Sequence, residues 1–135
     1  MTASNTKCLV VLLGGIIAIA LWCSRGGLAA QEIVLDTGEE KVTVMQDELD
    51  RGMKIFDEQC ATCHSNKEMI ANNDTLNLTD KKWKHGGKVA DIEKTIREGV
   101  PDTDMMPLKD KLLPREIRVV ARYVLYLNYG KEAGK

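Results

Sequence analysis

Three stretches of the chain carry apolar residues at the three- and four-residue spacing of an amphipathic helix. The first runs from about Gln46 to Gln59 and the second from about Val89 to Glu98. The last has Pro114 in its first turn, a favoured position, and ends at Gly130. Apolar side chains at this spacing fall on one face of a helix, where they can pack against other elements. The chain is therefore predicted to be mainly helical.

Each predicted helix has an apolar stripe that we expect to form part of the core. The stripes are Leu49, Gly52, Met53, Phe56 and Cys60 in the first helix, Val89, Ile92 and Ile96 in the second, and Ile117, Val120, Ala121, Val124 and Leu127 in the last.

Residues 31–45 alternate between apolar and polar positions instead. The apolar positions lie on either side of the turn sequence at residues 36–38, at Ile33, Leu35, Val42 and Val44. This pattern predicts a short β-hairpin. Because an isolated hairpin is only marginally stable in water, we expect it to lie against the helical body.

Two segments have no regular period. Residues 65–88 are polar and are interrupted by the asparagine-rich residues 72–74 and by Gly86-Gly87. This stretch is longer than an ordinary connection, so it is predicted to be an irregular functional loop. Residues 100–113 form a second predicted loop, which begins at Pro101 and ends before Pro114.

Residues 1–30 have the features of a targeting segment. Lys7 precedes a run of sixteen apolar residues from Cys8 to Cys23, and the small residue Ala30 stands before a plausible cleavage point at Gln31. A membrane span needs about 20 apolar residues, so a cleaved signal peptide is the prediction. The alternative is an uncleaved N-terminal anchor that holds the same domain at a membrane.

The rest of the chain is long enough for one domain. Residues 31–135 divide into an N-terminal extension, 31–45, and a helical domain, 46–135. They contain 17 basic and 20 acidic residues, a net charge of −3. A nucleic-acid-binding domain would show a strong basic excess, so that class is excluded.

The chemistry of the chain is concentrated at Cys60, Cys63 and His64. Their Cys-x-x-Cys-His pattern is that of c-type haem attachment. At the end of a helix, positions three and four apart share a face. The two thiols can therefore reach the two vinyl groups on one edge of a porphyrin, while His64 lies beneath the iron.

Other uses of this motif fit the sequence less well. A thioredoxin-like redox pair needs a βαβ context, which is missing around residues 60–64. A structural zinc site needs four nitrogen or sulfur ligands. Residues 31–135 supply no more than Cys60, Cys63, His64 and His85, and two of these, Cys63 and His64, are adjacent in the sequence. A disulfide across two intervening residues would be strained. Haem attachment is therefore the predicted role.

The second axial ligand is sought among residues beyond the motif. Met105 and Met106 lie in the loop before Pro107, which can wrap over the far face of a haem. A thioether ligand raises the potential of the iron, as suits an electron carrier. Two alternatives stay open: both methionines fill gaps in the core, or His85 is the ligand and gives a bis-histidine haem.

From about residue 46 to residue 129 the sequence resembles the class I cytochrome c family. The Gly52-x-x-x-Phe56 pattern is similar to the glycine and aromatic pair that precedes the haem motif in that family, and residues 60–64 are the haem motif itself. Met106-Pro107, followed by the last helix, resembles the axial-ligand loop and the final helix of the family.

This resemblance implies an all-α, small cytochrome c fold around one covalent haem c, with the hairpin as an extension outside the common core. The first and last helices of the family cross beside the haem, and Gly52, Phe56, Val120 and Tyr123 match the crossing. The family also favours Met106 as the axial ligand, because that methionine stands directly before a proline. Met105 is the second choice.

One feature departs from the family. Its members commonly have a proline soon after the haem motif, in a segment whose carbonyl fixes the axial histidine, but no proline lies between His64 and Pro101. Another carbonyl within residues 65–80 must then orient His64. Trp83 resembles an indole that bonds a haem carboxylate, or it simply packs within its loop. Two segments outside the haem motif, the hairpin and residues 77–87, together resemble parts of two subgroups of the family. These are the extrinsic photosystem cytochromes and the haem domains of cytochrome oxidase subunits.

The predicted function is outer-sphere electron transfer between transient redox partner proteins, with no catalytic residues. The protein is expected to be exported to the periplasm or an equivalent lumen. Two alternatives remain: a membrane-attached haem subunit of a respiratory or photosynthetic complex, and a haem enzyme or gas sensor with an open sixth site. One group of lysines is either a docking patch or an ordinary solvated loop surface: Lys81, Lys82, Lys84 and Lys88.

Overall fold

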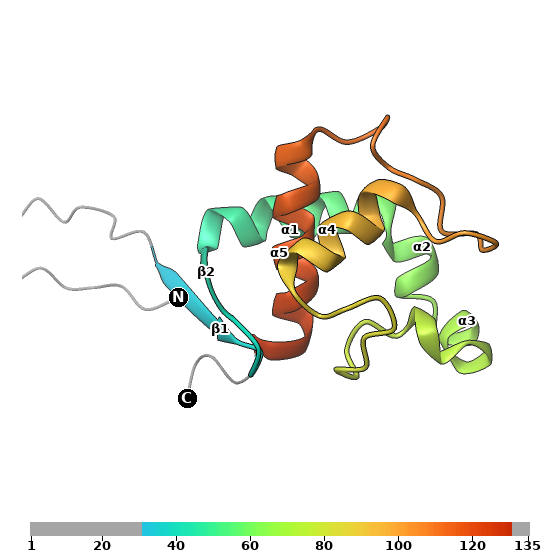
Figure 1. Ribbon diagram of the computed structural model, residues 1–135, viewed down its shortest axis with the longest axis horizontal. Coiled ribbons are helices and arrows are strands. Elements are labelled where there is room, and N and C mark those ends of the chain that lie inside the picture. Colours follow the sequence, from blue (N-terminus) through green and yellow to red (C-terminus); the bar gives the residue numbers. More distant parts are fainter. Residues whose placement is uncertain (1–30, 131–135) are drawn as a thin grey trace, which may run out of the picture.

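The computed structural model describes residues 31–130, which form a helical body with a two-stranded hairpin at one end (Figure 1). The elements are β1 (Glu32–Asp36), β2 (Lys41–Met45), α1 (Gln46–Gln59), α2 (Ala61–His64), α3 (Lys67–Asn72), the 3-10 helix η1 (Asp74–Leu76), α4 (Val89–Glu98) and α5 (Pro114–Tyr129). The predicted signal peptide or anchor lies outside the described residues. Among residues 31–130, no helix has the length and apolar character needed to cross a membrane.

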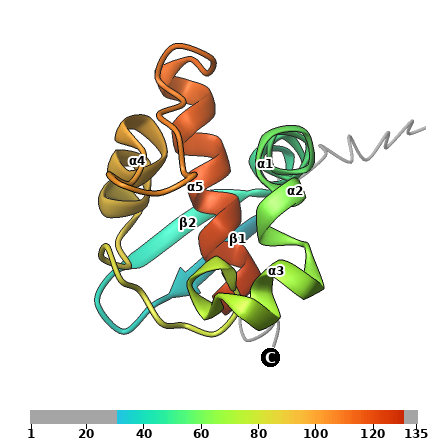
Figure 2. The ribbon, with the colours of Figure 1, turned by 90° about the vertical axis from the view of Figure 1, so that its right-hand side faces the viewer.

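Helices α1 and α5 cross at close range, as the family resemblance implied. A Cβ atom placed on Gly52 would lie 2.6 Å from the Cβ of Tyr123 and 2.8 Å from the Val119 carbonyl oxygen. The rings of Phe56 and Tyr123 pack beside this point, with their centroids 5.5 Å apart. Figure 2 shows α5 in the centre of the molecule, with α1 on one side and α4 on the other.

The apolar stripes predicted most of the core, with one error at Met53, and they left out the buried Leu108 in the loop after α4. Met53 was predicted to be buried, but it is 45% exposed, because Gly52 rather than its neighbour faces α5 at the crossing. On α5, Leu125 and Asn128 are also buried and were not predicted.

The hairpin is confirmed, and its apolar face belongs to the main core. In the antiparallel register Ile33 pairs with Val44 and Leu35 pairs with Val42. Leu35 and Val44 are completely buried in the same cluster as Leu125 of α5. The extension is therefore an integral layer of the domain, which explains how a two-stranded sheet is stable here.

Residues 65–88 were predicted to be irregular, but they contain α3 and η1. The side chain of Asn66 accepts hydrogen bonds from the backbone N–H groups of Glu68 and Met69 at the start of α3. Asn73 accepts one from Thr75 at the start of η1. Asparagine caps of this kind can start short helices that have no apolar stripe, so periodicity alone does not detect them.

The hairpin turn also caps α4 through Glu40. Its carboxylate accepts a hydrogen bond of 2.6 Å from the backbone N–H of Val89, the first residue of that helix. A carboxylate at this position pairs a free N–H group and meets the positive end of the helix dipole.

We expect Glu40→Ala to lower the free energy of unfolding by about 1 kcal/mol, measured by chemical denaturation, because a helix cap is lost. Glu39→Ala is the matched control, since Glu39 is 69% exposed and lies 3.9 Å from the ammonium of Lys88. A surface pair of this kind contributes under about 0.5 kcal/mol. Equal losses in the two variants would contradict the capping role.

Candidate functional site

A cavity of about 1190 Å³ lies on the side of the molecule formed by the end of α1, α2, the segment before α4, and the loop after α4. It exceeds the roughly 300–1,000 Å³ of an ordinary ligand pocket. Cys60, Cys63, His64 and Met106 all line it. The structure thus brings all four predicted site residues to one cavity.

The end of α1 and the short helix α2 place the two cysteines and the histidine. The backbone N–H of His64 donates a 3.0 Å hydrogen bond to the carbonyl of Cys60, so the motif forms one helical turn. Both thiols are free. Burial raises the pKa of the Cys60 thiol to about 11, and the nearby Cys63 adds to this rise.

The environment of Cys60 is not that of a typical reactive cysteine. A reactive cysteine is typically favoured by a lowered pKa, whereas burial raises the pKa of the Cys60 thiol. Within the part of the chain that the structure describes, no group of three or more His, Cys, Asp or Glu side chains is arranged to hold a metal ion.

His64 is oriented by the carbonyl of Leu76, the last residue of η1. The imidazole Nδ1 lies 2.9 Å from this oxygen. A carbonyl can only accept, so Nδ1 carries the proton and Nε2 keeps its lone pair for a metal. Leu76 is within the range 65–80 in which such a carbonyl was expected. Its position matches that of the carbonyl which the family resemblance required.

The loop after α4 presents the two methionines differently. Met106 is 67% exposed although it lines the cavity, so its thioether is not used in core packing. Met105 also lines the cavity, but it is partly buried against the core, and its carbonyl accepts a 2.9 Å hydrogen bond from Val100. Leu108 is buried and anchors the loop to Ile96 through a 3.1 Å backbone bond.

Gly99 allows this loop to pack against the end of α4. Its φ and ψ are 70° and −170°, a region that essentially only glycine occupies. A Cβ atom there would overlap the carbonyl oxygen of Met105 and would lie 2.8 Å from the nitrogen of Pro107. The sequence predicts that the helix stops at Gly99, as it does, but the close contact of this glycine with the methionine loop was not predicted.

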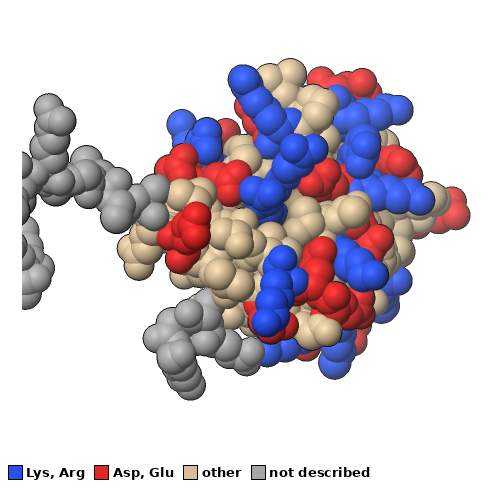
Figure 3. Space-filling model, turned by 60° about the vertical axis from the view of Figure 1, so that its left-hand side comes forward, with Lys and Arg blue, Asp and Glu red and all other residues tan. Residues whose placement is uncertain are grey.

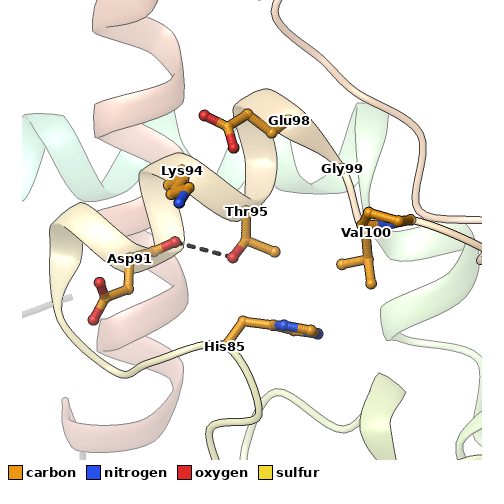
Figure 4. A pocket seen from close by; sticks show the side chains of 8 residues that line it. His85, Asp91, Lys94, Thr95, Glu98, Gly99 and Val100 are labelled. Carbon is orange, nitrogen blue, oxygen red and sulfur yellow. Dashed lines mark hydrogen bonds between the residues drawn. The ribbon is translucent and has the colours of Figure 1, made fainter.

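His85 lies between the main cavity and a smaller pocket on the surface of α4. The smaller pocket has a volume of about 320 Å³, and charged groups of both signs line it. Figure 4 shows His85 facing Thr95, whose hydroxyl donates a 3.0 Å hydrogen bond to the Asp91 carbonyl. Because His85 also lines the main cavity, it remains the alternative to Met106 as a ligand.

Trp83 is held within its own loop and against α5. Its indole N–H donates a 3.4 Å hydrogen bond to the Tyr129 hydroxyl, and a Cβ on Gly87 would lie 2.6 Å from the ring. Loop packing, one of the two predicted roles, is therefore present. Trp83 also lines the main cavity.

The four lysines of the predicted patch have different surroundings. Lys88 lies 3.9 Å from a carboxylate oxygen of Glu39, and the ammonium of Lys81 lies 5.0 Å from the centre of the Tyr129 ring. Lys82 and Lys84 line the cavity. On the face seen in Figure 3, basic and acidic side chains are interspersed rather than separated by sign.

Comparison with known proteins shows similarity to subunits of cbb3-type cytochrome c oxidases. Residues 47–124 match the family model described as cytochrome c oxidase, cbb3-type, subunit III. The chain is 39% identical over 87 residues to the cbb3-type cytochrome c oxidase subunit FixP of Bradyrhizobium diazoefficiens. This match covers 60% of the chain and 28% of that protein. It is 36% identical over 89 residues to the subunit CcoP of Rhodobacter capsulatus, which covers 59% and 29%.

A third relative, the subunit FixP of Sinorhizobium medicae, is 30% identical over 108 residues. That match covers 72% of the chain and 37% of the relative. The chain therefore matches only about a third of the length of these oxidase subunits.

Proposed function

The chain belongs to the family of c-type cytochromes described as cytochrome c oxidase, cbb3-type, subunit III, and from this premise we propose that it transfers electrons through one covalently bound haem c. The observation that carries the proposal is the single cavity that Cys60, Cys63, His64 and Met106 share. A haem held there would supply an iron that can cycle between Fe(II) and Fe(III).

The residues around the cavity fit this cofactor. Cys60 and Cys63 would form thioether bonds, and the Nε2 atom of His64, left free by the bond to Leu76, would bind the iron. Met106 is proposed as the second ligand, because Met106 is exposed at the cavity while Met105 is partly buried against the core. Two protein ligands leave no coordination position for a substrate, so the proposed role is electron transfer rather than catalysis.

We further propose that the protein works as a membrane-attached haem subunit of a respiratory oxidase, rather than as a freely diffusing carrier. The similarity to subunits FixP and CcoP supports this choice. The haem domain would lie in the periplasm or an equivalent lumen, with residues 8–23 as its anchor. An exported protein whose first residue is Gln31 would instead support the carrier.

The haem attachment is tested by expressing the protein together with a cytochrome c maturation system. The wild-type chain is expected to gain the mass of one haem, to keep it in denaturing solvent and to titrate as a one-electron couple. Cys60→Ala/Cys63→Ala should lose covalent haem completely, because no thiol then remains in the cavity. Met69→Ala, which alters another residue of the cavity lining, is the control that should keep it.

Extraction of the haem from the wild-type chain by acidic acetone would overturn this proposal. Binding of carbon monoxide to the reduced protein at neutral pH would favour the haem enzyme or gas sensor, since that ligand needs an open sixth site.

A further inference from the structure

We propose that Asn128, on α5, is a positioning residue for the haem ligand His64. It would act by holding the segment whose Leu76 carbonyl orients the imidazole. This inference rests on the proposed function, because it assigns to Asn128 an effect on a haem-bound histidine.

Asn128 is a buried polar residue whose hydrogen-bonding groups are directed at one distant segment. The residue is 7% exposed. Its side-chain oxygen accepts a 2.8 Å hydrogen bond from the backbone N–H of Lys81, and its amide nitrogen donates to the carbonyl of Leu78 and, at 3.4 Å, to that of Val124. A buried amide is costly unless it is paired, and here both of its polar atoms have partners.

The bonded segment connects directly to the carbonyl that holds His64. Only Asn77 separates Leu76 from Leu78, and the Asn77 side chain accepts hydrogen bonds from the N–H and the hydroxyl of Thr79, at 3.0 and 2.8 Å. The backbone between the two carbonyls is therefore short and locally fixed, so a movement of the Leu78 carbonyl would move that of Leu76.

The last turn of α5 secures this segment at a second point. Tyr129, next to Asn128, accepts the hydrogen bond from the Trp83 indole. Figure 2 shows the C-terminal end of α5 beside the segment that follows α3. Because no proline fixes the backbone between residues 65 and 88, these bonds from α5 supply the restraint.

Hydrogen exchange in the reduced, haem-loaded protein tests the inference. In Asn128→Leu, the Lys81 amide and the His64 Nδ1–H should both exchange about fivefold faster than in the wild type, as expected when a hydrogen bond worth about 1 kcal/mol is lost. The midpoint potential should shift as well, because the bond to Nδ1 tunes the basicity of the ligand.

Leu125→Ala is the matched control, since it removes a completely buried side chain from the same helix without touching these bonds. Leu125→Ala should lower the free energy of unfolding. Its His64 Nδ1–H should still exchange no faster than global unfolding of that variant allows. Asn128→Asp keeps the acceptor for Lys81 and removes the donor to Leu78. It should therefore protect the Lys81 amide but not the His64 proton, and it carries the test if Asn128→Leu does not fold.

Unchanged exchange of the His64 proton in both Asn128 variants would overturn the inference. An equal effect in Leu125→Ala at the same global stability would also overturn it. A wild-type protein with covalent haem but an unprotected Lys81 amide would refute this inference alone. Failure to attach haem, with the Lys81 amide protected, would refute the proposed function instead.

Discussion

Gly52→Val is expected to lower the free energy of unfolding by on the order of 3 kcal/mol, because it places a branched side chain where α1 and α5 touch. The added Cβ would meet the Cβ of Tyr123 at 2.6 Å and the Val119 carbonyl oxygen at 2.8 Å. A backbone carbonyl cannot rotate out of the way as a side chain can. The two helices must therefore move apart, which also disturbs the Phe56 and Tyr123 ring contact.

Lys54→Val is the matched control for this change. It introduces the same side chain into the same helix at an exposed position, so it should cost only about 0.5 kcal/mol through lower helix propensity. Denaturant unfolding of the two variants measures the difference. Equal stability of the two would show that the helices do not meet at Gly52.

Gly99→Ala is expected to damage both stability and iron ligation. The φ and ψ of 70° and −170° alone cost about 1–3 kcal/mol for a residue with a side chain. The new Cβ would also overlap the Met105 carbonyl oxygen and crowd the nitrogen of Pro107, both of them backbone atoms. The loop must shift, and it carries Met106 with it. Thioether-bound ferric iron gives a weak far-red absorption band. In the oxidised Gly99→Ala protein this thioether band should weaken, and the midpoint potential of the haem should fall.

Gly38→Ala is the control for Gly99→Ala, because it strains the backbone without displacing the loop that carries Met106. Gly38 has a φ of 81°, but no atom lies within 4 Å of the position of its Cβ. This variant should lose about 1–2 kcal/mol of stability and keep the full thioether band. A Gly99→Ala protein with an intact band would contradict the role given to Gly99.

The elements with a strong period were predictable from the sequence. Helices α1, α4 and α5 and the hairpin have the predicted bounds, because their apolar faces are long enough to set a clear pattern. Met53 shows the limit of this approach. Its spacing fits the stripe, but a helix crossing at Gly52 leaves room for only one of two adjacent positions, and no pattern within α1 reveals where α5 passes.

The residues proposed to bind the haem could be predicted from the sequence, but the groups that hold those residues in place could not. The motif at residues 60–64 indicates its proposed haem-attachment residues directly, because they are neighbours in the sequence. The carbonyl that holds His64 belongs to Leu76, and a backbone group leaves no signature in the sequence. Asn128 was missed for a related reason: it continues an apolar stripe from Val124, and its main partners lie 47 and 50 residues away.

The optical spectrum of the oxidised, haem-loaded protein tests the central claim most directly, because thioether-bound ferric iron gives a weak far-red band. The wild-type protein should show this band, Met105→Ala should keep it, and Met106→Ala should lose it. Absence of the band in the wild type, or its loss in Met105→Ala but not in Met106→Ala, would contradict a site closed by His64 and Met106.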